Sequence, residues 1–456
     1  MKKNIQSLID RYRLPESMAG CSLEADLNPA QGFFQFGKDA ICFGRCTSGR
    51  VASSVAAPLY DVGESVAVNG QGLHLPFDPD EIVKNLLYEC AFPQDGHSLF
   101  NSAVRAAYYA VRPLLAKDIR KHLQRIQMTA QSKASFPDWP LDSSVEHILE
   151  ALLTGIMRAQ RLEAVPFIWF WPDGCSCAAI LTHDVETTKG RDYCQRLMDL
   201  EEEVGLRSSF QLVPERRYSI PPEFLASMRE RGFEINVHDL NHDGRLFLNH
   251  EIFQQRVKAI NQYGKSMRAR GFRSGALYRN LKWFGDLDFE YDMSVPNVGR
   301  WEAQTGGCCT VMPYFVGNLL ELPLNTVQDY VLFEMWGQYS IDLWKEQSRL
   351  IREKHGLISF LVHPDYVMED RPWTIYKQLL EFICRFKAQE KMWFALPGDV
   401  NDWWRKRAQM FLVQDGQGNW RIEGPGSERA RLAFAELKGD SVVYRVTEAS
   451  SARANY

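Results

Sequence analysis

The chain has 456 residues, of which 45% are hydrophobic and 24% are charged. This length gives material for two or three domains, and the balance of 53 basic against 57 acidic residues argues against a protein that binds nucleic acid. No apolar stretch has the length of a signal-peptide core or of a transmembrane helix. We therefore expect a cytoplasmic protein without stable membrane insertion.

The N-terminal residues 1–97 predict a small β-rich domain. Short apolar runs, broken by Gly and Asn-Gly, fill residues 32–75 and are typical of strands and turns. Asp78 and Pro79 form a helix start signal, and they predict a helix over residues 80–88.

Residues 98–165 predict a helical connector. The segment 98–127 is amphipathic and basic, with Pro113 as a break or kink. It fits a helix on a membrane surface or a partner, or a helix that lies on the next domain with its basic face in water, and we favour the second reading. A further helix is predicted from about Asp142 to Arg161.

Residues 166–405 predict a domain in which strands and helices alternate. Runs typical of strands lie near residues 178–182, 208–213, 233–238, 271–277, 289–295, 309–316, 319–324, 357–362 and 393–396. Helical patterns cover residues 191–204, 222–231, 251–270, 341–354 and 374–387. Such alternation is typical of a mostly parallel sheet or a (β/α) barrel, whose ligand site lies at the carboxyl ends of the strands. Residues 406–456 predict a small β-rich appendage.

Three of the strand-like runs end in side chains that bind metals or transfer protons. These are Asp184 and Glu186 after the first run, His238 and His242 after the second, and His363 after the third. Carboxylates two residues apart point the same way from an extended strand. Because two such acids resist ionising together unless a cation or a shared proton relieves the repulsion, we expect a metal here.

The metal ligands and the proton-transfer groups can be separated. Two imidazoles with one carboxylate leave coordination positions open for water and substrate, as in a catalytic site. If Glu186 joins the two histidines, Asp184 is free to take a proton from a water that the metal acidifies.

Three further residues are candidates for supporting roles. Arg273, in the motif GFRSG, would keep Asp184 ionised, unless it is an ordinary surface arginine. His363 would act as the general acid to the leaving nitrogen, held in one tautomer by a carboxylate. Asp292, in YDMSVPN, is a candidate for that carboxylate, although an Asp at a strand end is often a turn residue.

Four short motifs resemble, in order, the successive motifs of a known family. They are THDVE at 182–186, HDLNH at 238–242, FRSG at 272–275 and FLVH at 360–363. Together they are similar to the polysaccharide deacetylases, the NodB-homology or carbohydrate esterase family 4 group, over about residues 178–404. The resemblance implies a deformed (β/α)7 barrel, here with a small N-terminal β/α region and a short β-rich C-terminal appendage.

The resemblance also implies a role for each matched residue. Asp184 would be the base, Glu186, His238 and His242 the metal ligands, Arg273 the residue that orients the base, and His363 the acid. The metal would be a divalent ion, with zinc favoured and Co²⁺, Ni²⁺ or Mn²⁺ as alternatives. The reaction would be the hydrolysis of N-acetyl groups from amino sugars in glycans.

The chain departs from the family pattern at several positions. Val185 separates the two acids that are usually adjacent, and Asp239 replaces the usual Ser or Thr after the first histidine. Gly275 and Ala276 stand where Pro and an aromatic residue are typical. That region would supply a backbone N–H to the oxyanion and shape the sugar site.

Three functions remain as hypotheses. The leading one is a metal-dependent hydrolase that removes the acetyl group of an N-acetylated glycan or amino-sugar intermediate. The alternatives are an amidohydrolase acting on a small C–N substrate, such as a cyclic ureide or a formamide, and a catalytically inactive glycan-binding protein on the same scaffold. Aromatic residues that could stack on sugar rings, or pack in the core instead, are Tyr278, Trp283, Trp301, Tyr314 and Trp336.

Overall fold

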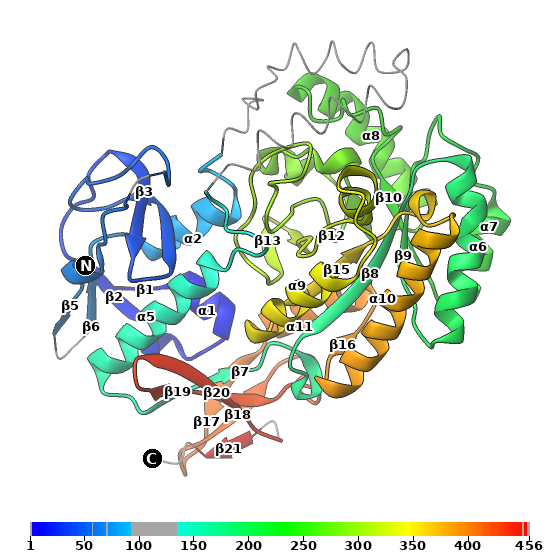
Figure 1. Cartoon of the computed structure of the whole chain (residues 1–456). Helices are drawn as coiled ribbons and strands as arrows, with labels where there is room; N and C mark the ends of the chain where they lie inside the picture. Colours follow the sequence, from blue (N-terminus) through cyan, green and yellow to red (C-terminus); the bar gives the residue numbers. More distant parts are fainter. Residues whose placement is uncertain (1, 57, 70–71, 93–134, 449–450, 454–456) are drawn as a thin grey trace. The chain divides into compact units, whose positions relative to one another are not determined.

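The computed structural model describes residues 2–56, 58–69, 72–92, 135–448 and 451–453 (Figure 1). The chain forms two compact units. One comprises Met1–Ala91, Ser143–Ser176 and Asp402–Tyr456, and the other comprises Phe92–Asp142 and Cys177–Asn401. The basic helix expected within residues 98–127 lies outside the described residues.

The first unit contains the expected N-terminal strands. A sheet has the order β1 (Lys2–Asn4), β2 (Gly20–Leu23), β6 (Gly72–Leu75) and β5 (Ala67–Asn69), and β3 (Gln31–Phe36) pairs antiparallel with β4 (Ala40–Arg45). The helices are α1 (Gln6–Tyr12), α2 (Pro79–Leu87) and α5 (Ser144–Gln160). The predicted start of α2 is confirmed, because the Asp78 carboxylate accepts the N–H groups of Asp80 and Glu81.

The C-terminal strands belong to the same unit. β7 (Ala164–Ile168) pairs with β19 (Leu432–Lys438), which pairs with β20 (Ser441–Val446), while β17 (Phe411–Gln414), β18 (Asn419–Glu423) and β21 (Ser451–Arg453) form another small sheet. The first unit thus combines three ranges that are distant in the sequence, whereas the sequence predicts four domains that follow one another along the chain. The reason is that β7 is buried along its whole length and its backbone partner, β19, comes from the distant end of the chain.

The second unit is built on a mostly parallel sheet. In spatial order its strands are β13 (Tyr314–Val316), β14 (Leu319–Glu321), β12 (Tyr291–Asp292), β11 (Gly271–Arg273), β10 (Glu234–His238), β9 (Ser209–Leu212), β8 (Ala178–Val185) and β15 (Leu357–Leu361), with β16 (Trp393–Phe394) also pairing with β8. Only the pair β13–β14 is antiparallel among these. The helices are α6 (Thr188–Glu203), α7 (Pro222–Glu230), α8 (His250–Ser266), α9 (Asp342–Glu353) and α10 (Asp370–Gln389), and α11 (Pro397–Ala408) begins in this unit and ends in the first.

The sheet curls into a deformed barrel of the polysaccharide deacetylase type. All eight residues of β8 are buried, as expected for a parallel strand covered on both faces, and α6 and α7 lie outside β9 in Figure 1. Side chains bridge the seam between β15 and the segment after β14. The Ser359 hydroxyl accepts the Asn325 N–H at 2.7 Å, and the Thr326 hydroxyl donates to the Ser359 carbonyl at 2.8 Å.

Most predicted elements of this unit are confirmed within a few residues. The strands are shorter than expected at β11 and β12, because the chain turns into loops as soon as it reaches the carboxyl edge of the sheet. Among the helices that the structure describes, none is long and apolar enough to cross a lipid bilayer.

Candidate metal and acid–base site

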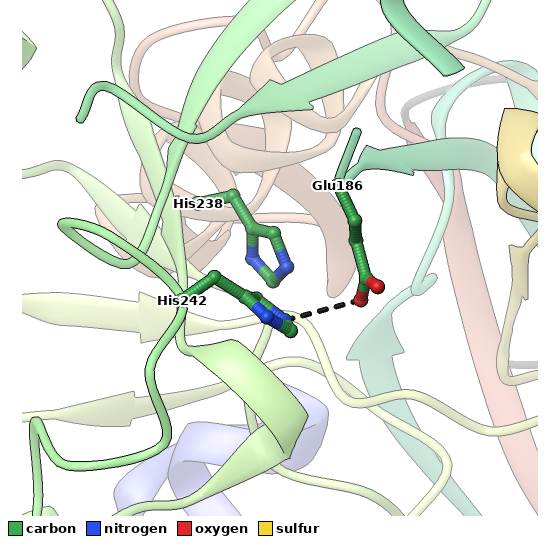
Figure 2. Close-up of side chains that lie close together, drawn as sticks. All are labelled: Glu186, His238 and His242. Atoms are coloured by element: carbon green, nitrogen blue, oxygen red, sulfur yellow. Dashed lines mark ion pairs between the residues drawn. The ribbon is translucent and has the colours of Figure 1, made fainter. Parts of the chain in front are cut away.

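Glu186, His238 and His242 converge at the carboxyl edge of the sheet. One ligand atom from each lies within 4.8 Å of the others, and Figure 2 shows the three side chains turned toward one another. His238 is the last residue of β10, and Glu186 directly follows β8. The closest pair is His242 Nε2 and Glu186 Oε1, which are 3.1 Å apart. The structure therefore brings together the three residues predicted as metal ligands.

His242 reaches the cluster because the loop after β10 turns sharply. Asp239 and His242 both have left-handed backbone conformations, with φ of 56° and 52°. The Asp239 N–H donates to the Arg273 carbonyl at 2.8 Å, which ties the start of the loop to β11. The turn directs the second imidazole back over the end of β10, where its ring centroid is 4.8 Å from that of His238.

The ligand atoms fit a divalent cation. His238 Nδ1 donates to the Arg273 carbonyl at 3.1 Å, so Nε2 carries the lone pair. That buried Nε2 has no hydrogen-bond partner among the described residues, an arrangement that costs free energy unless a ligand satisfies the atom. Burial lowers the pKa of His238, which favours the neutral imidazole that metals bind. Two nitrogens and one carboxylate oxygen are a donor set that zinc and similar ions accept.

Glu186 is ionised, and a hydrogen bond from its backbone N–H to Asp365 fixes its position. Burial opposes its ionisation, but His242 and, less strongly, His363 and His238 lower its pKa below the usual range for glutamate. Its N–H donates to Asp365 Oδ2 at 3.2 Å, and the Thr187 hydroxyl donates to the same carboxylate. Asp365 follows His363 by two residues, so it links the loops after β8 and β15. No role was predicted for this aspartate.

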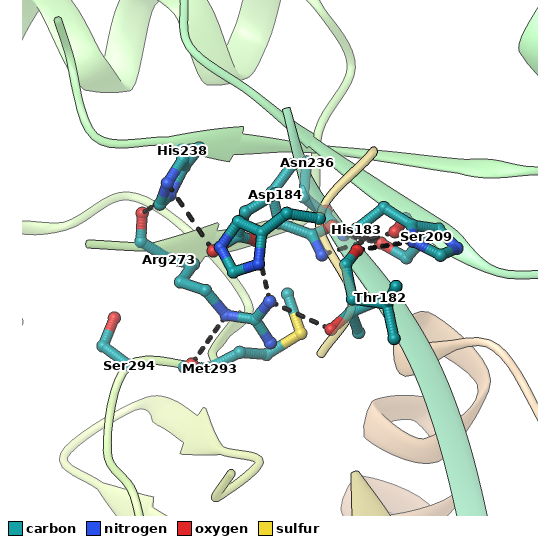
Figure 3. A network of polar contacts seen from close by, with 12 residues as sticks. Thr182, His183, Asp184, Ser209, Asn236, His238, Arg273, Met293 and Ser294 are labelled. Atoms are coloured by element: carbon teal, nitrogen blue, oxygen red, sulfur yellow. Dashed lines mark hydrogen bonds and ion pairs between the residues drawn. The ribbon is translucent and has the colours of Figure 1, made fainter. Parts of the chain in front are cut away.

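Asp184 points into the cluster as an ionised carboxylate. Burial raises its pKa, but Arg273 and His238 outweigh this effect, so that the pKa lies below the usual value. Figure 3 shows the pair with Arg273, whose Nη1 donates to Asp184 Oδ1 at 2.8 Å and to the Thr182 hydroxyl at 2.9 Å. The other oxygen, Oδ2, lies 3.5 Å from His238 Nε2. Arg273 is thus a buried partner of Asp184 rather than a surface arginine.

His363 is paired with a carboxylate, but not with the predicted one. Its Nδ1 donates to Asp329 Oδ1 at 2.6 Å, and its backbone N–H donates to Asp329 Oδ2 at 2.7 Å. Burial lowers the pKa of His363, but Asp329, Glu186 and Asp184 together raise it to about 10. The imidazole is therefore protonated at neutral pH, and its Nε2 is 3.8 Å from Glu186 Oε1.

The expectation that Asp292 holds His363 is wrong. The Asp292 carboxylate accepts the N–H and the hydroxyl of Ser294 at 2.8 and 2.9 Å. Asp329 occupies that position because it precedes a short helical turn, Tyr330–Met335, and caps it. An Asp before an apolar helical run is a helix-start signal, which could have pointed to Asp329 in the sequence.

The predicted sugar-stacking aromatics mainly pack against other protein groups. The Trp301 and Trp336 rings lie 5.0 Å apart, and both contact Trp139. An aromatic residue that the sequence analysis did not single out, Tyr366, lies with its ring centroid 5.1 Å from that of His363. This tyrosine follows Asp365 in the same loop, so its position is set by the end of β15.

The fold is a deformed barrel, and Asp184 and His363 lie beside a Glu–His–His cluster whose geometry could hold a metal ion. No protein-family model and no curated protein matches the sequence. Among solved structures, it is similar to a Mycobacterium smegmatis protein assigned to the polysaccharide deacetylases, with 18% identity, a TM-score of 0.41, and 52% of this chain and 93% of that chain covered.

Two further solved structures match over about the same share of the chain. PuuE allantoinase is 12% identical, with a TM-score of 0.40 and coverage of 52% of this chain and 92% of that chain. The peptidoglycan deacetylase PdaC from Bacillus subtilis is 11% identical, with a TM-score of 0.31 and coverage of 51% and 93%. The matched structures thus include polysaccharide deacetylases, the family that the four sequence motifs resemble.

Proposed function

We propose that the protein is a metal-dependent hydrolase that removes the N-acetyl group from an amino sugar in a glycan or a saccharide intermediate. The observation that carries this proposal is an ionised carboxylate and a protonated imidazole beside the same ligand cluster. An ionised Asp184 lies 3.5 Å from His238, and a protonated His363 lies 3.8 Å from Glu186. A hydrolase of this kind needs an ionised base and a protonated acid at the same pH. The lowered pKa of Asp184 and the raised pKa of His363 favour these two forms.

The metal would be held by Glu186, His238 and His242. When bound, a divalent cation supplies Lewis-acid polarisation of the acetyl carbonyl and lowers the pKa of water, and zinc is the ion that we favour. The three side chains leave coordination positions for water and substrate, which a closed structural site would not.

Asp184 would accept the proton of the attacking water. Arg273 fixes Oδ1 of the carboxylate, so Oδ2 is the oxygen left to act as base. The arginine also keeps the base ionised when the pH falls, because it lowers the pKa of the aspartate. The Arg273 guanidinium is itself oriented by the Met293 carbonyl, to which Nε donates at 2.9 Å.

His363 would donate its Nε2 proton to the leaving amine. Asp329 binds the Nδ1–H and holds the imidazole in the orientation that directs Nε2 toward the cluster. Tyr366 borders this ring, and we propose that it contacts the acetyl group or the sugar.

Hydrolysis of a small cyclic ureide or formamide is the second candidate function. The feature that favours it is the Gly275–Ala276 turn, where deacetylase motifs have Pro and an aromatic residue. A catalytically inactive glycan-binding protein is less well supported, because such a protein needs neither the Arg273–Asp184 pair nor the Asp329–His363 pair.

The test measures the metal content of the purified protein and the acetate that it releases from N-acetylglucosamine oligomers, in parallel with the hydrolysis of cyclic ureides. We expect a divalent metal and acetate release that is lost in Asp184→Asn. Ureide hydrolysis without acetate release would support the second candidate. Metal binding without turnover of either substrate class would support the binding protein.

A further inference from the structure

The loop after β9, residues 213–218, contacts the backbone beside two of the three ligands. We propose that Arg217 and Tyr218 are positioning residues that set the separation of Glu186 and His242 before a metal binds. This inference rests on the metal site of the proposed function and extends it to residues outside the ligand set.

Tyr218 separates the ends of β8 and β9. The last paired residues of these strands are Val185 and Leu212. In a continuing parallel ladder, the Val213 N–H would donate to the Val185 carbonyl. Instead, the Tyr218 hydroxyl accepts the Val213 N–H at 2.8 Å and donates to the Val185 carbonyl at 2.7 Å. One oxygen atom thus stands between the strands, and they diverge at the residue before Glu186.

The hydroxyl can fill this role because it keeps its proton. Burial raises the pKa of Tyr218 well above the ordinary value for tyrosine. A neutral hydroxyl donates one hydrogen bond and accepts others, so it satisfies both backbone groups that the interrupted ladder leaves open.

Arg217 secures the other side of the site. Its Nε donates to the Asn241 carbonyl at 3.2 Å, and its Nη2 donates to the His242 carbonyl and lies 3.3 Å from His242 Nδ1. The Glu215 N–H donates to the Leu240 carbonyl at 2.9 Å, so the loop is also joined to this segment through its backbone. These contacts hold the turn in which His242 has a left-handed backbone conformation.

Adjacent residues of one loop therefore restrain both members of the closest ligand pair. Glu186 is placed through Val185, and His242 is placed through its own carbonyl, so that the two side chains face each other at 3.1 Å. His238 differs, because β10 and the Arg273 carbonyl hold it. Ligands that are already in place lose less conformational freedom on binding, which strengthens the affinity.

The experiment measures Co²⁺ binding to the metal-free full-length protein by calorimetry, together with the visible absorption of the bound Co²⁺. We expect Tyr218→Phe and Arg217→Lys each to weaken binding by about 10- to 100-fold, as for other residues that orient metal ligands, and to change the absorption bands. The control is Tyr263→Phe, which removes a hydroxyl that donates to Glu215 of the same loop at 3.3 Å. This control should bind Co²⁺ like the unmodified protein.

The outcomes separate this inference from the proposed function. Absence of Co²⁺ binding by the unmodified protein would overturn the metal site itself. Binding by the unmodified protein with the same affinity and spectrum in both loop variants would overturn the positioning role alone. If Tyr218→Phe shows no cooperative thermal transition, Arg217→Lys decides by the same criteria.

Discussion

The carboxylate of Asp239 lies in the space that a side chain at position 275 would need. A Cβ built on Gly275 would stand 2.5 Å from Asp239 Oδ2 and 3.0 Å from His242 Cδ2. Asp239 cannot easily move, because its other oxygen accepts the Leu240 N–H at 2.6 Å. Both residues depart from the deacetylase motifs, and the Asp239 carboxylate fits where it does because position 275 carries no side chain.

This contact predicts that Gly275→Ala is destabilising and that Asp239→Ser restores part of the loss. The added methyl group would push against Asp239 and His242, at a cost of about 1–3 kcal/mol in the free energy of unfolding. Denaturant unfolding of the two single variants and the double variant measures their coupling. Strictly additive effects would show that the two positions are independent.

We expect Asp184→Asn to lose activity without losing the metal. Asparagine keeps the size of the side chain but does not accept a proton, so kcat should fall by about 10²- to 10⁴-fold. The metal content should stay at that of the unmodified protein, because Asp184 is not in the ligand set. Elemental analysis beside the acetate-release assay gives both quantities, and loss of the metal would assign Asp184 to the ligands instead.

Asp329→Asn should shift the alkaline limb of the pH–rate profile to lower pH. Asp329 is the largest influence that raises the pKa of His363 to about 10, against burial. Without that carboxylate the pKa falls, and His363 loses its acidic proton at a lower pH. The measurement is kcat/KM as a function of pH. Asp292→Asn is the matched control, since its carboxylate bonds to Ser294 and leaves His363 untouched.

Metal affinity should rise with pH around neutrality. Burial lowers the pKa of His242, but Glu186 outweighs this and raises it above the ordinary value for histidine. A proton therefore competes with the metal for the imidazole until the pH exceeds that pKa. Calorimetric titration with Co²⁺ between about pH 6 and pH 8 should show tightening affinity. An affinity that is independent of pH would mean that His242 is not a ligand.

The sequence was informative where the chemistry follows a strand. Glu186, His238 and Asp184 are identifiable because an apolar run ends at ionisable side chains, and parallel strands bring such ends to one edge of the sheet. The barrel of the second unit was predictable for the same reason, since local periodicity marks most of its strands and helices.

The partner of His363 depends on contacts that are distant in the sequence. Asp292 lies within a predicted strand and Asp329 precedes an apolar run, so residue type alone does not choose between them. The choice is made by how the segment after β14 lies against β15, where Asn325 and Thr326 bond to Ser359. No local pattern records that packing, just as none records the pairing of β7 with β19.

The pairing of β7 with β19 also bears on the order in which the protein is made. During translation, β7 leaves the ribosome long before Leu432–Lys438, so the backbone N–H and C=O groups that pair with β19 have no partner until the whole intervening barrel has been synthesised. The barrel can complete its own core in that interval, whereas the unit that contains β7 is finished last. In a nascent chain arrested before residue 432, β7 would therefore have an unpaired edge, to which a chaperone or another chain can bind.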